Sequence, residues 1–251
     1  MAALELQDVK RHFGGVKAVD GVSFEVPAGK VTGLIGPNGS GKSTLVNLIA
    51  GVLGLSSGEV RLHGKPISTE AADAVARQGV ARTFQNIRLL PEASVLDNVL
   101  IGFYRLERSS MFSSLLGLPS SRSETRQLRD RGRELLARFE MSAFENVPAG
   151  GLAYGFQRRV EMMRAVASSP SVLLLDEPVA GMNDVEASAL GNIFSRLAED
   201  GMAVLVIEHN TRFVAELCEQ VHVLDSGRLI AQGTPQEVMR DPVVVAAYLG
   251  T

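Results

Sequence analysis

The sequence is poor in several features that define whole classes of protein. It has one cysteine, Cys218, so it can form neither an intrachain disulfide nor a cage of thiolate metal ligands. Its longer apolar runs, such as Val172–Leu175 and Ala203–Ile207, fall far short of the about 20 residues that a membrane-spanning helix requires. Glu5 and Asp8 also argue against a secretory signal at the start of the chain. We therefore expect a soluble protein of a reducing compartment.

The chain also lacks a surplus of charge. Its 251 residues include 25 basic and 28 acidic ones, and the net charge of −3 disfavours a protein that wraps nucleic acid. Arginines do gather between Arg122 and Arg138, but Glu124, Asp130 and Glu134 alternate with them. This mixture predicts a solvated helical face and no nucleic-acid partner. Apolar residues make up 45% of the chain, which is enough for a sizeable core.

The first 65 residues indicate strands and turns. The segment Val22–Val26 alternates apolar and polar residues, as in a strand with one buried face. Val31–Ile35 is a short run that looks buried on both faces, and the apolar residues of Lys42–Ala50 recur at helical spacing. The order is therefore strand, glycine-rich loop, helix.

Residues 86–150 indicate mainly helix. The segment Glu124–Phe139 places Leu128, Leu135 and Leu136 near one face with Phe139. The serine-rich segment Ser109–Ser123, before it, predicts a mobile loop.

After residue 160, strands and helices alternate, which predicts a parallel sheet covered by helices. The expected strands are Val172–Asp176, Ala203–Ile207, Val221–Asp225 and Arg228–Gln232, and the expected helices are 184–199 and 211–219. A capping box at Thr234–Glu237 opens a closing helix. We predict an α/β fold: a mostly parallel sheet with an N-terminal antiparallel subdomain, in which residues 1–85 and 161–251 form the core and 86–160 an inserted helical subdomain.

The glycine-rich loop carries the clearest chemical signal. Residues Gly36, Gly41, Lys42 and Ser43 satisfy the phosphate-loop pattern G-x-x-x-x-G-K-[ST]. Glycines let backbone N–H groups converge on phosphate oxygens, and the next helix points its positive end at the same anion. Lys42 supplies a cation to the β- and γ-phosphates, and the Ser43 hydroxyl can bind Mg²⁺. The expected nucleotide-binding positions are Gly36, Pro37, Asn38, Gly39, Ser40, Gly41, Lys42, Ser43 and Thr44.

A second signal is the strand Val172–Leu175 followed by two carboxylates, Asp176 and Glu177. A buried strand that ends in Asp176 would deliver its carboxylate to a Mg²⁺ ion at the edge of the sheet. Glu177 could then accept a proton from the attacking water. Without the phosphate loop, these acids would be interpreted as a solvated strand end.

Together these segments resemble the ATPase subunits of ABC transporters over essentially the whole chain. The shared features are the phosphate loop, Gln85, the segment Leu152–Arg159, the Asp176–Glu177 pair and Glu208-His209. Finer details resemble the ATPases of branched-chain (hydrophobic) amino acid importers: His12–Val19, Arg82–Asn86, Leu152–Gly155, Ala180–Asn183 and the final Ala247–Gly250.

The resemblance implies a role for several single residues. Phe13 would stack on adenine, Gln85 would contact Mg²⁺ and the attacking water, and His209 would hydrogen-bond the γ-phosphate. Ala153, Gly155 and Gln157 would reach the ATP of a facing subunit, although Ala153 replaces the usual serine of this segment and Phe156 a glutamine. Glu177, His209, Gln85 and Lys42 are therefore the expected catalytic residues, and ATP and Mg²⁺ the expected ligands.

The resemblance also implies partners and a location. These are integral-membrane permease subunits, a second ATPase subunit that is either a copy or a paralogue, and indirectly a periplasmic solute-binding protein. The chain would be peripheral at the cytoplasmic face of the inner membrane. The alternatives are the ATPase of a urea or amide importer or of lipopolysaccharide export, a non-transport ATPase of the same fold, and a subunit that senses ATP without hydrolysing it.

Overall fold

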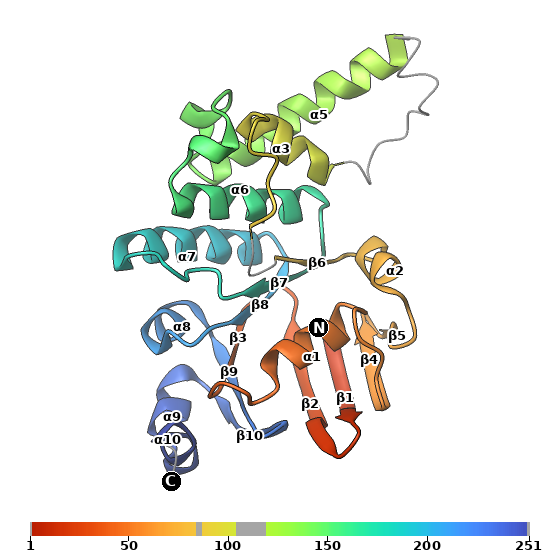
Figure 1. Ribbon diagram of the computed structural model, residues 1–251, viewed down its shortest axis with the longest axis vertical. Helices are drawn as coiled ribbons and strands as arrows, with labels where there is room; N and C mark the ends of the chain where they lie inside the picture. Colours follow the sequence, from red (N-terminus) through yellow and green to blue (C-terminus); the bar gives the residue numbers. More distant parts are fainter. Residues whose placement is uncertain (1, 84–86, 104–118, 250–251) are drawn as a thin grey trace. The chain divides into compact units, whose positions relative to one another are not determined.

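The computed structural model describes residues 2–83, 87–103 and 119–249, without the side chains of 119–122 and 249. The chain forms two compact units, one made of Met1–Gln85 and Ser171–Thr251 and the other of Asn86–Pro170 (Figure 1). The inserted unit was expected to end at residue 160. The boundary lies ten residues later, because helix α6 (Tyr154–Ala167) runs through that position without a break.

The first unit contains a four-stranded antiparallel sheet in the order β2-β1-β4-β5. Its strands are β1 (Ala2–Phe13), β2 (Val16–Pro27), β4 (Ser57–Leu62) and β5 (Lys65–Pro66). Val22, Phe24 and Val26 are buried while the residues between them are exposed, which confirms the alternation expected for β2. One face of this sheet therefore covers a core.

A second sheet of six strands, in the order β10-β9-β3-β8-β7-β6, is parallel except for the β9–β10 pair. Its strands are β3 (Val31–Ile35), β6 (Val80–Arg82), β7 (Val172–Asp176), β8 (Ala203–Ile207), β9 (Gln220–Asp225) and β10 (Arg228–Gly233). Every residue of β3, β7 and β8 is buried, as expected for strands covered on both faces. The predicted α/β fold class is confirmed.

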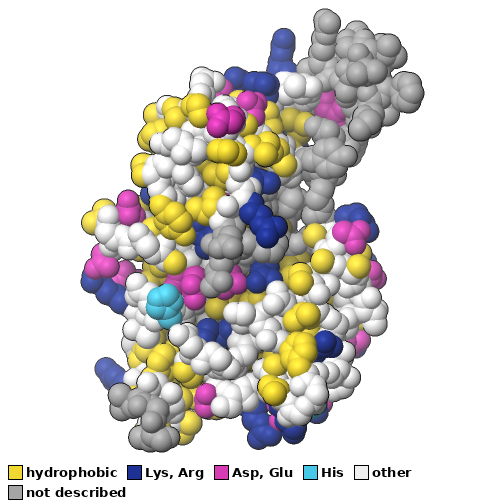
Figure 2. Space-filling model, viewed as in Figure 1, with side chains coloured by type: hydrophobic (Ala, Val, Ile, Leu, Met, Phe, Trp, Pro, Cys, Tyr) yellow, Lys and Arg dark blue, Asp and Glu magenta, His cyan; other side chains and the backbone are white. Residues whose placement is uncertain are grey.

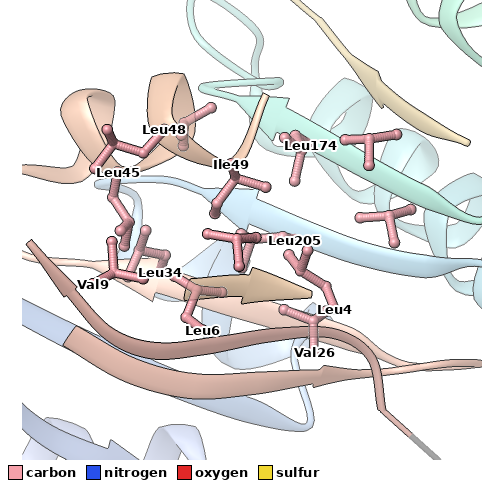
Figure 3. Packing of buried hydrophobic residues seen from close by; sticks show 14 of the residues in the cluster. Leu4, Leu6, Val9, Val26, Leu34, Leu45, Leu48, Ile49, Leu174 and Leu205 are labelled. Atoms are coloured by element: carbon pink, nitrogen blue, oxygen red, sulfur yellow. The ribbon is translucent and has the colours of Figure 1, made fainter. Parts of the chain in front are cut away.

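The core of this unit lies between the two sheets and helix α1 (Lys42–Ile49). Figure 3 shows its side chains pointing toward one another: Leu4, Leu6, Val9 and Val26 from the antiparallel sheet, Leu45, Leu48 and Ile49 from α1, and Leu34, Leu174 and Leu205 from the parallel sheet. Each buried leucine stabilises the fold by about 1.5–3 kcal/mol relative to an exposed one. The helix that follows the phosphate loop is thus fixed by packing.

Helices also cover the opposite face of the parallel sheet. They include α7 (Asp184–Glu199) and α8 (Thr211–Leu217), and Gly33 of β3 lies directly against Val214 and Cys218. Helix α8 ends two residues before the expected position, because Cys218 adopts an extended backbone with φ −91° and ψ 138°. The remaining helices of this unit are α2 (Ala72–Arg77), α9 (Pro235–Arg240) and α10 (Pro242–Leu249). The capping box at Thr234 and Glu237 is confirmed.

The second unit is helical, as expected. It contains α3 (Val95–Gly102), α5 (Pro119–Arg138), α6 and the 3-10 turns η2 (Ser142–Phe144) and η3 (Ala149–Gly151). Leu135, Leu136 and Phe139 are buried and Leu128 is half-buried, so the predicted apolar face is confirmed.

The prediction of a loop over Ser109–Ser123 is wrong at its C-terminal end, because α5 begins at Pro119. Proline is well suited to the first turn of a helix, where the missing N–H has no intrahelical acceptor. Residues 109–118 lie outside the described part of the chain.

The surface carries charges of both signs. The described arginines of the 122–138 cluster are exposed, and Arg133 pairs with Asp130 at 3.2 Å and Glu145 at 3.0 Å. Figure 2 likewise shows basic and acidic side chains intermixed on the visible face. The described helices include none that is both long and apolar enough to cross a bilayer.

Candidate functional site

A cavity of about 570 Å³ lies in the first unit, at the carboxyl ends of strands β3 and β7. Because these strands are parallel, the loops that follow them meet at one edge of the sheet. The lining residues are Val16, Lys17, Ala18, Asn38, Gly39, Ser40, Gly41, Lys42, Ser43, Thr44, Asp176, Glu177, Ile207, Ser226 and Gly227. The structure therefore brings most of the phosphate loop and both predicted carboxylates to one cavity.

The backbone of the phosphate loop depends on glycine. Gly36 and Gly41 have φ of 147° and 105°, values that residues other than glycine rarely adopt. A Cβ atom would lie 2.0 Å from the carbonyl oxygen of Leu224 at Gly36 and 2.4 Å from that of Ala18 at Gly41. The loop is thus held against its neighbours by close backbone approach. No side chain caps the start of α1, so its first N–H groups can face an anion.

Lys42 is the first residue of α1, and its side chain contacts the phosphate loop that precedes this helix. Its Nζ donates hydrogen bonds to the carbonyl oxygens of Gly36 at 2.8 Å and Pro37 at 2.9 Å. Burial lowers the pKa of the Lys42 ammonium group, and the charges of Glu177 and Asp176 oppose that shift. The ammonium group is therefore placed among the atoms that would surround a phosphate.

Asp176 forms an ion pair with an arginine that the sequence analysis assigned no role. Arg82, the last residue of β6, donates from Nη2 to Asp176 Oδ2 at 3.0 Å and from Nη1 to Asn47 Oδ1 at 2.5 Å. The two charged side chains are only 12% and 6% exposed. Arg82 therefore connects the acidic end of β7 with helix α1, which follows the phosphate loop.

Glu177 has an unusual backbone. Its φ of 48° is in the left-handed region, which is strained for a residue with a side chain, and such conformations cluster at functional sites. The conformation is fixed by a 2.9 Å hydrogen bond from the Glu177 N–H to the carbonyl oxygen of Ile207. His209 lies two residues after Ile207, and its Nδ1 is 3.8 Å from Glu177 Oε1. Two of the predicted catalytic side chains are thus neighbours.

The cavity offers oxygen ligands of the kind that Mg²⁺ prefers. Ser43 brings a hydroxyl group and Asp176 a carboxylate to its wall. Mg²⁺ is usually held by one or two protein oxygens together with phosphate oxygens and water, so this sparse donor set fits that ion. The described residues contain no cluster of three or more histidine, cysteine, aspartate or glutamate side chains that would hold a metal by itself.

Phe13 does not line the cavity. Phe13 is 44% exposed at the end of β1, with the Arg11 guanidinium 4.5 Å from its ring centroid, so it is not an ordinary core phenylalanine. Gln85 lies outside the described residues.

The segment Leu152–Arg159 belongs to the second unit and begins helix α6. Ala153 occupies the N-cap position without a capping side chain, and Gly155 follows in the first turn. The Gln157 side chain donates to the carbonyl oxygen of Leu152 at 2.9 Å, and the Phe156 ring packs against Phe144 with centroids 4.8 Å apart. The unusual Phe156 therefore belongs to the packing of its own unit.

Sequence reasoning placed strands on both sides of Ser226 and Gly227 but did not assign these two residues to the site. Ser226 and Gly227 line the cavity, and the Gly227 N–H donates to the carbonyl oxygen of Ser40 at 2.9 Å. A Ser-Gly dipeptide between two strands is a turn signal. The signal marks the turn, but its place beside the phosphate loop follows from the pairing of β9 with β3, which the sequence pattern does not reveal.

Comparisons with known proteins agree with this geometry. Residues 19–180 match the family model described as ABC transporter, and residues 228–251 match the model described as branched-chain amino acid ATP-binding cassette transporter. The branched-chain amino acid transport ATP-binding protein BraF of Pseudomonas aeruginosa is 36% identical over 248 residues, which cover 98% of this chain and 97% of BraF. The lipopolysaccharide export ATP-binding protein LptB of Escherichia coli K12 is 32% identical over 250 residues, which cover 100% of this chain and 98% of LptB.

Solved structures give the same result. The crystal structure of a nucleotide-free ATP-binding cassette from an ABC transporter has a TM-score of 0.87 and 34% identity, with both chains covered completely. The dimeric structure of MJ0796, a bacterial ABC transporter cassette, has a TM-score of 0.78 and 25% identity, covering 92% of this chain and 98% of that one. The chain belongs to the ABC transporter ATP-binding family.

Proposed function

We propose that this chain is the ATP-hydrolysing subunit of an importer for branched-chain or other hydrophobic amino acids. The observation that supports hydrolysis is that Asn38–Thr44 of the phosphate loop, Asp176 and Glu177 converge on one cavity. A protein that only senses ATP would need the loop but not the acid beyond the metal ligand.

In this proposal the phosphate loop binds the triphosphate. Backbone N–H groups of the loop and the first turn of α1 donate to phosphate oxygens, and Lys42 exchanges its loop carbonyl acceptors for the β- and γ-phosphates. Ser43, Asp176 and Gln85 would hold Mg²⁺, which would supply positive charge to neutralise the phosphate oxygens. This electrostatic clamp supplies most of the rate enhancement.

Glu177 would act as the general base. Its carboxylate accepts a proton from water as the water oxygen attacks the γ-phosphorus and the bond to the leaving ADP oxygen breaks. His209, whose ring lies beside Glu177, would hydrogen-bond the γ-phosphate. Phe13 is exposed and available to stack on adenine.

A second ATPase subunit would complete each site. The uncapped start of α6, with Ala153 and Gly155, presents N–H groups suited to the phosphates of a nucleotide held by the facing subunit. Gln157 would hold this segment in shape through its bond to the Leu152 carbonyl. The dimeric cassette among the similar structures supports a pair, formed by two copies or by this chain and a paralogue.

The solute class rests on the comparisons. The C-terminal residues 228–251 match the branched-chain amino acid transporter model, and BraF is more similar to this chain than LptB is, at 36% against 32% identity. Integral-membrane permease subunits and, indirectly, a periplasmic binding protein would be the partners. The chain would then work as a peripheral subunit at the cytoplasmic face of the inner membrane.

The full-length similarity to LptB supports lipopolysaccharide export as the second candidate. Reconstitution of the chain with its permease subunits in proteoliposomes separates the two functions. Import predicts uptake of leucine that depends on ATP and the binding protein, while export predicts no leucine uptake and ATPase activity that responds to lipopolysaccharide.

Glu177→Gln tests hydrolysis. The variant should lower ATP turnover roughly 10²- to 10⁴-fold while ATP still binds, because it removes the base and leaves the clamp intact. Glu199→Gln, at the exposed end of α7, is the control and should hydrolyse ATP normally. Near-normal turnover by Glu177→Gln would remove Glu177 from its proposed role.

A further inference from the structure

Glu208 is a buried acid that the proposed chemistry does not use. It lies between the end of β8 and His209, and its side chain is 1% exposed. Within the described part of the chain, no lysine or arginine forms an ion pair with it. A carboxylate so far from solvent requires hydrogen-bond donors to remain charged.

Backbone N–H groups from two loops supply these donors. Glu208 Oε1 accepts from the N–H of Val179 at 3.2 Å, and Oε2 accepts from the N–H of His209 at 3.1 Å and of Asn210 at 3.4 Å. Val179 follows Glu177 in the loop after β7, whereas His209 and Asn210 lie in the loop after β8. One carboxylate therefore joins the two loops that carry the proposed base and the proposed phosphate ligand.

The ends of β7 and β8, from which these two loops start, are joined by a further hydrogen bond. The Glu177 N–H donates to the carbonyl oxygen of Ile207 at 2.9 Å, immediately before Glu208. This bond fixes the backbone of Glu177 but not the loop after it or the backbone of His209. Glu208 supplies those two restraints, on either side of the 3.8 Å contact between Glu177 and His209.

Only an ionised carboxylate suits this arrangement. It offers two oxygens and no donor, so it can accept all three N–H groups. A glutamine of the same shape would turn its NH₂ group toward one of the two loops and leave an N–H there without an acceptor. Burial raises the pKa of Glu208 above its ordinary value, whereas the three N–H donors and His209 lower it, so these bonds favour the charged form.

We propose that Glu208 is a positioning residue for ATP hydrolysis, which holds the Val179 loop and His209 in fixed relation to Glu177 through backbone N–H groups. This inference rests on the proposed function. Glu208 does not line the nucleotide cavity, whose wall includes its neighbour Ile207. Its loss should therefore affect the chemical step more than the binding of ATP.

Glu208→Gln is the test variant. We expect kcat to fall roughly 10- to 100-fold, because one backbone N–H in a loop that orients the site loses its acceptor. KM and the ATP dissociation constant should stay within about twofold of the wild-type values. Glu219→Gln is the control, because Glu219 is 57% exposed and pairs only at the surface with Lys30 at 2.6 Å. This control should leave kcat unchanged.

Backbone amide NMR provides a readout that does not need hydrolysis. In Glu208→Gln, the resonances of Val179, His209 and Asn210 should shift, while those of Gly39 and Gly41 in the phosphate loop should not. If the wild-type chain hydrolyses no ATP, the proposed function fails, yet this spectrum still tests the bridge between the loops.

Two results would overturn the proposal. One is an unchanged kcat in Glu208→Gln. The other is a joint loss of kcat and ATP affinity with shifted phosphate-loop resonances, which would indicate general damage to the fold. Should this variant fail to fold, Glu208→Asp keeps the charge but is one methylene shorter. It should lower kcat without changing ATP affinity, and wild-type kcat in that variant would also refute the bridge.

Discussion

Arg82 and Asp176 form an ion pair at 3.0 Å in which both side chains are nearly buried. Arg82 also contacts Asn47 on α1, so the pair joins β6, β7 and the helix after the phosphate loop. The next residue, Thr83, accepts a hydrogen bond from the Asp176 N–H at 3.3 Å through its hydroxyl group. Two consecutive residues, Arg82 at the end of β6 and Thr83 after it, therefore bond to Asp176, one to its carboxylate and the other to its backbone N–H.

Arg82→Met should destabilise the fold. It removes the charge and the two donors while it keeps an apolar stem, and Asp176 is left as a buried carboxylate with less compensation. Breaking a buried pair in this way costs about 3–5 kcal/mol. Urea denaturation would measure the change in the free energy of unfolding.

Two further variants show whether the charge is the cause. Arg82→Met combined with Asp176→Asn should recover much of the lost stability, because the uncompensated carboxylate is gone. Arg77→Met breaks a pair with Asp73 whose side chains are 63% and 67% exposed, and it should cost about 1 kcal/mol or less. Equal losses in Arg82→Met and Arg77→Met would contradict this account.

Lys42→Ala should weaken ATP binding. The loop loses its cation, and a hydrogen bond to a charged group contributes about 1.5–3 kcal/mol, so the dissociation constant should rise roughly 10- to 150-fold. Calorimetric titration with ATP would measure this. Lys30→Ala, which removes a half-exposed lysine paired with Glu219, should leave the affinity unchanged. An unchanged affinity in Lys42→Ala would contradict the binding role.

The parts of the fold that the sequence predicted well are those set by local pattern. Strands β7 and β8 and helix α7 have the expected bounds, because fully apolar strands and an N-capped amphipathic helix are each specified by their own residues. The phosphate loop was equally clear, since Gly36 and Gly41 mark positions where a side chain would collide with neighbouring carbonyl groups.

The contacts that could not be predicted from the sequence join residues far apart in the chain. Arg82 is 94 residues from Asp176, and Glu208 is 29 residues from Val179. Neither pair has a spacing or periodicity that would reveal it, because each depends on which strands lie side by side. The start of α5 at Pro119 was missed for a different reason: serine-rich composition indicates a loop but does not forbid a helix.

Phe13→Ala should weaken the binding of ATP but not of inorganic tripolyphosphate. Stacking of a base on an aromatic ring contributes about 1–3 kcal/mol, and tripolyphosphate has no base. Phe13 is 44% exposed, so its loss should leave the core intact. Phe13→Trp keeps an aromatic face and should retain ATP affinity. Equal weakening for both ligands in Phe13→Ala would rule out stacking on adenine.

His222 should make the stability of the fold depend on pH. Its side chain is buried against the Phe24 ring, with centroids 4.4 Å apart, and burial lowers the pKa of His222 from 6.5 to about 4. Above pH 6.5 the imidazole is neutral in both states, and the fold keeps its full stability. As pH falls from 6.5 toward 4, the unfolded chain takes up the proton first, so the free energy of unfolding decreases.

Urea denaturation at a series of pH values would measure this effect. Between pH 7 and pH 5, His222 should account for a loss of about 2 kcal/mol in the free energy of unfolding. His222→Phe keeps a flat ring beside Phe24 but cannot be protonated, so the slope of stability against pH should become shallower by that amount. His63→Gln, which replaces an exposed histidine, should leave the slope unchanged. Identical slopes for wild type and His222→Phe would show that His222 is protonated as readily in the folded chain as in the unfolded one.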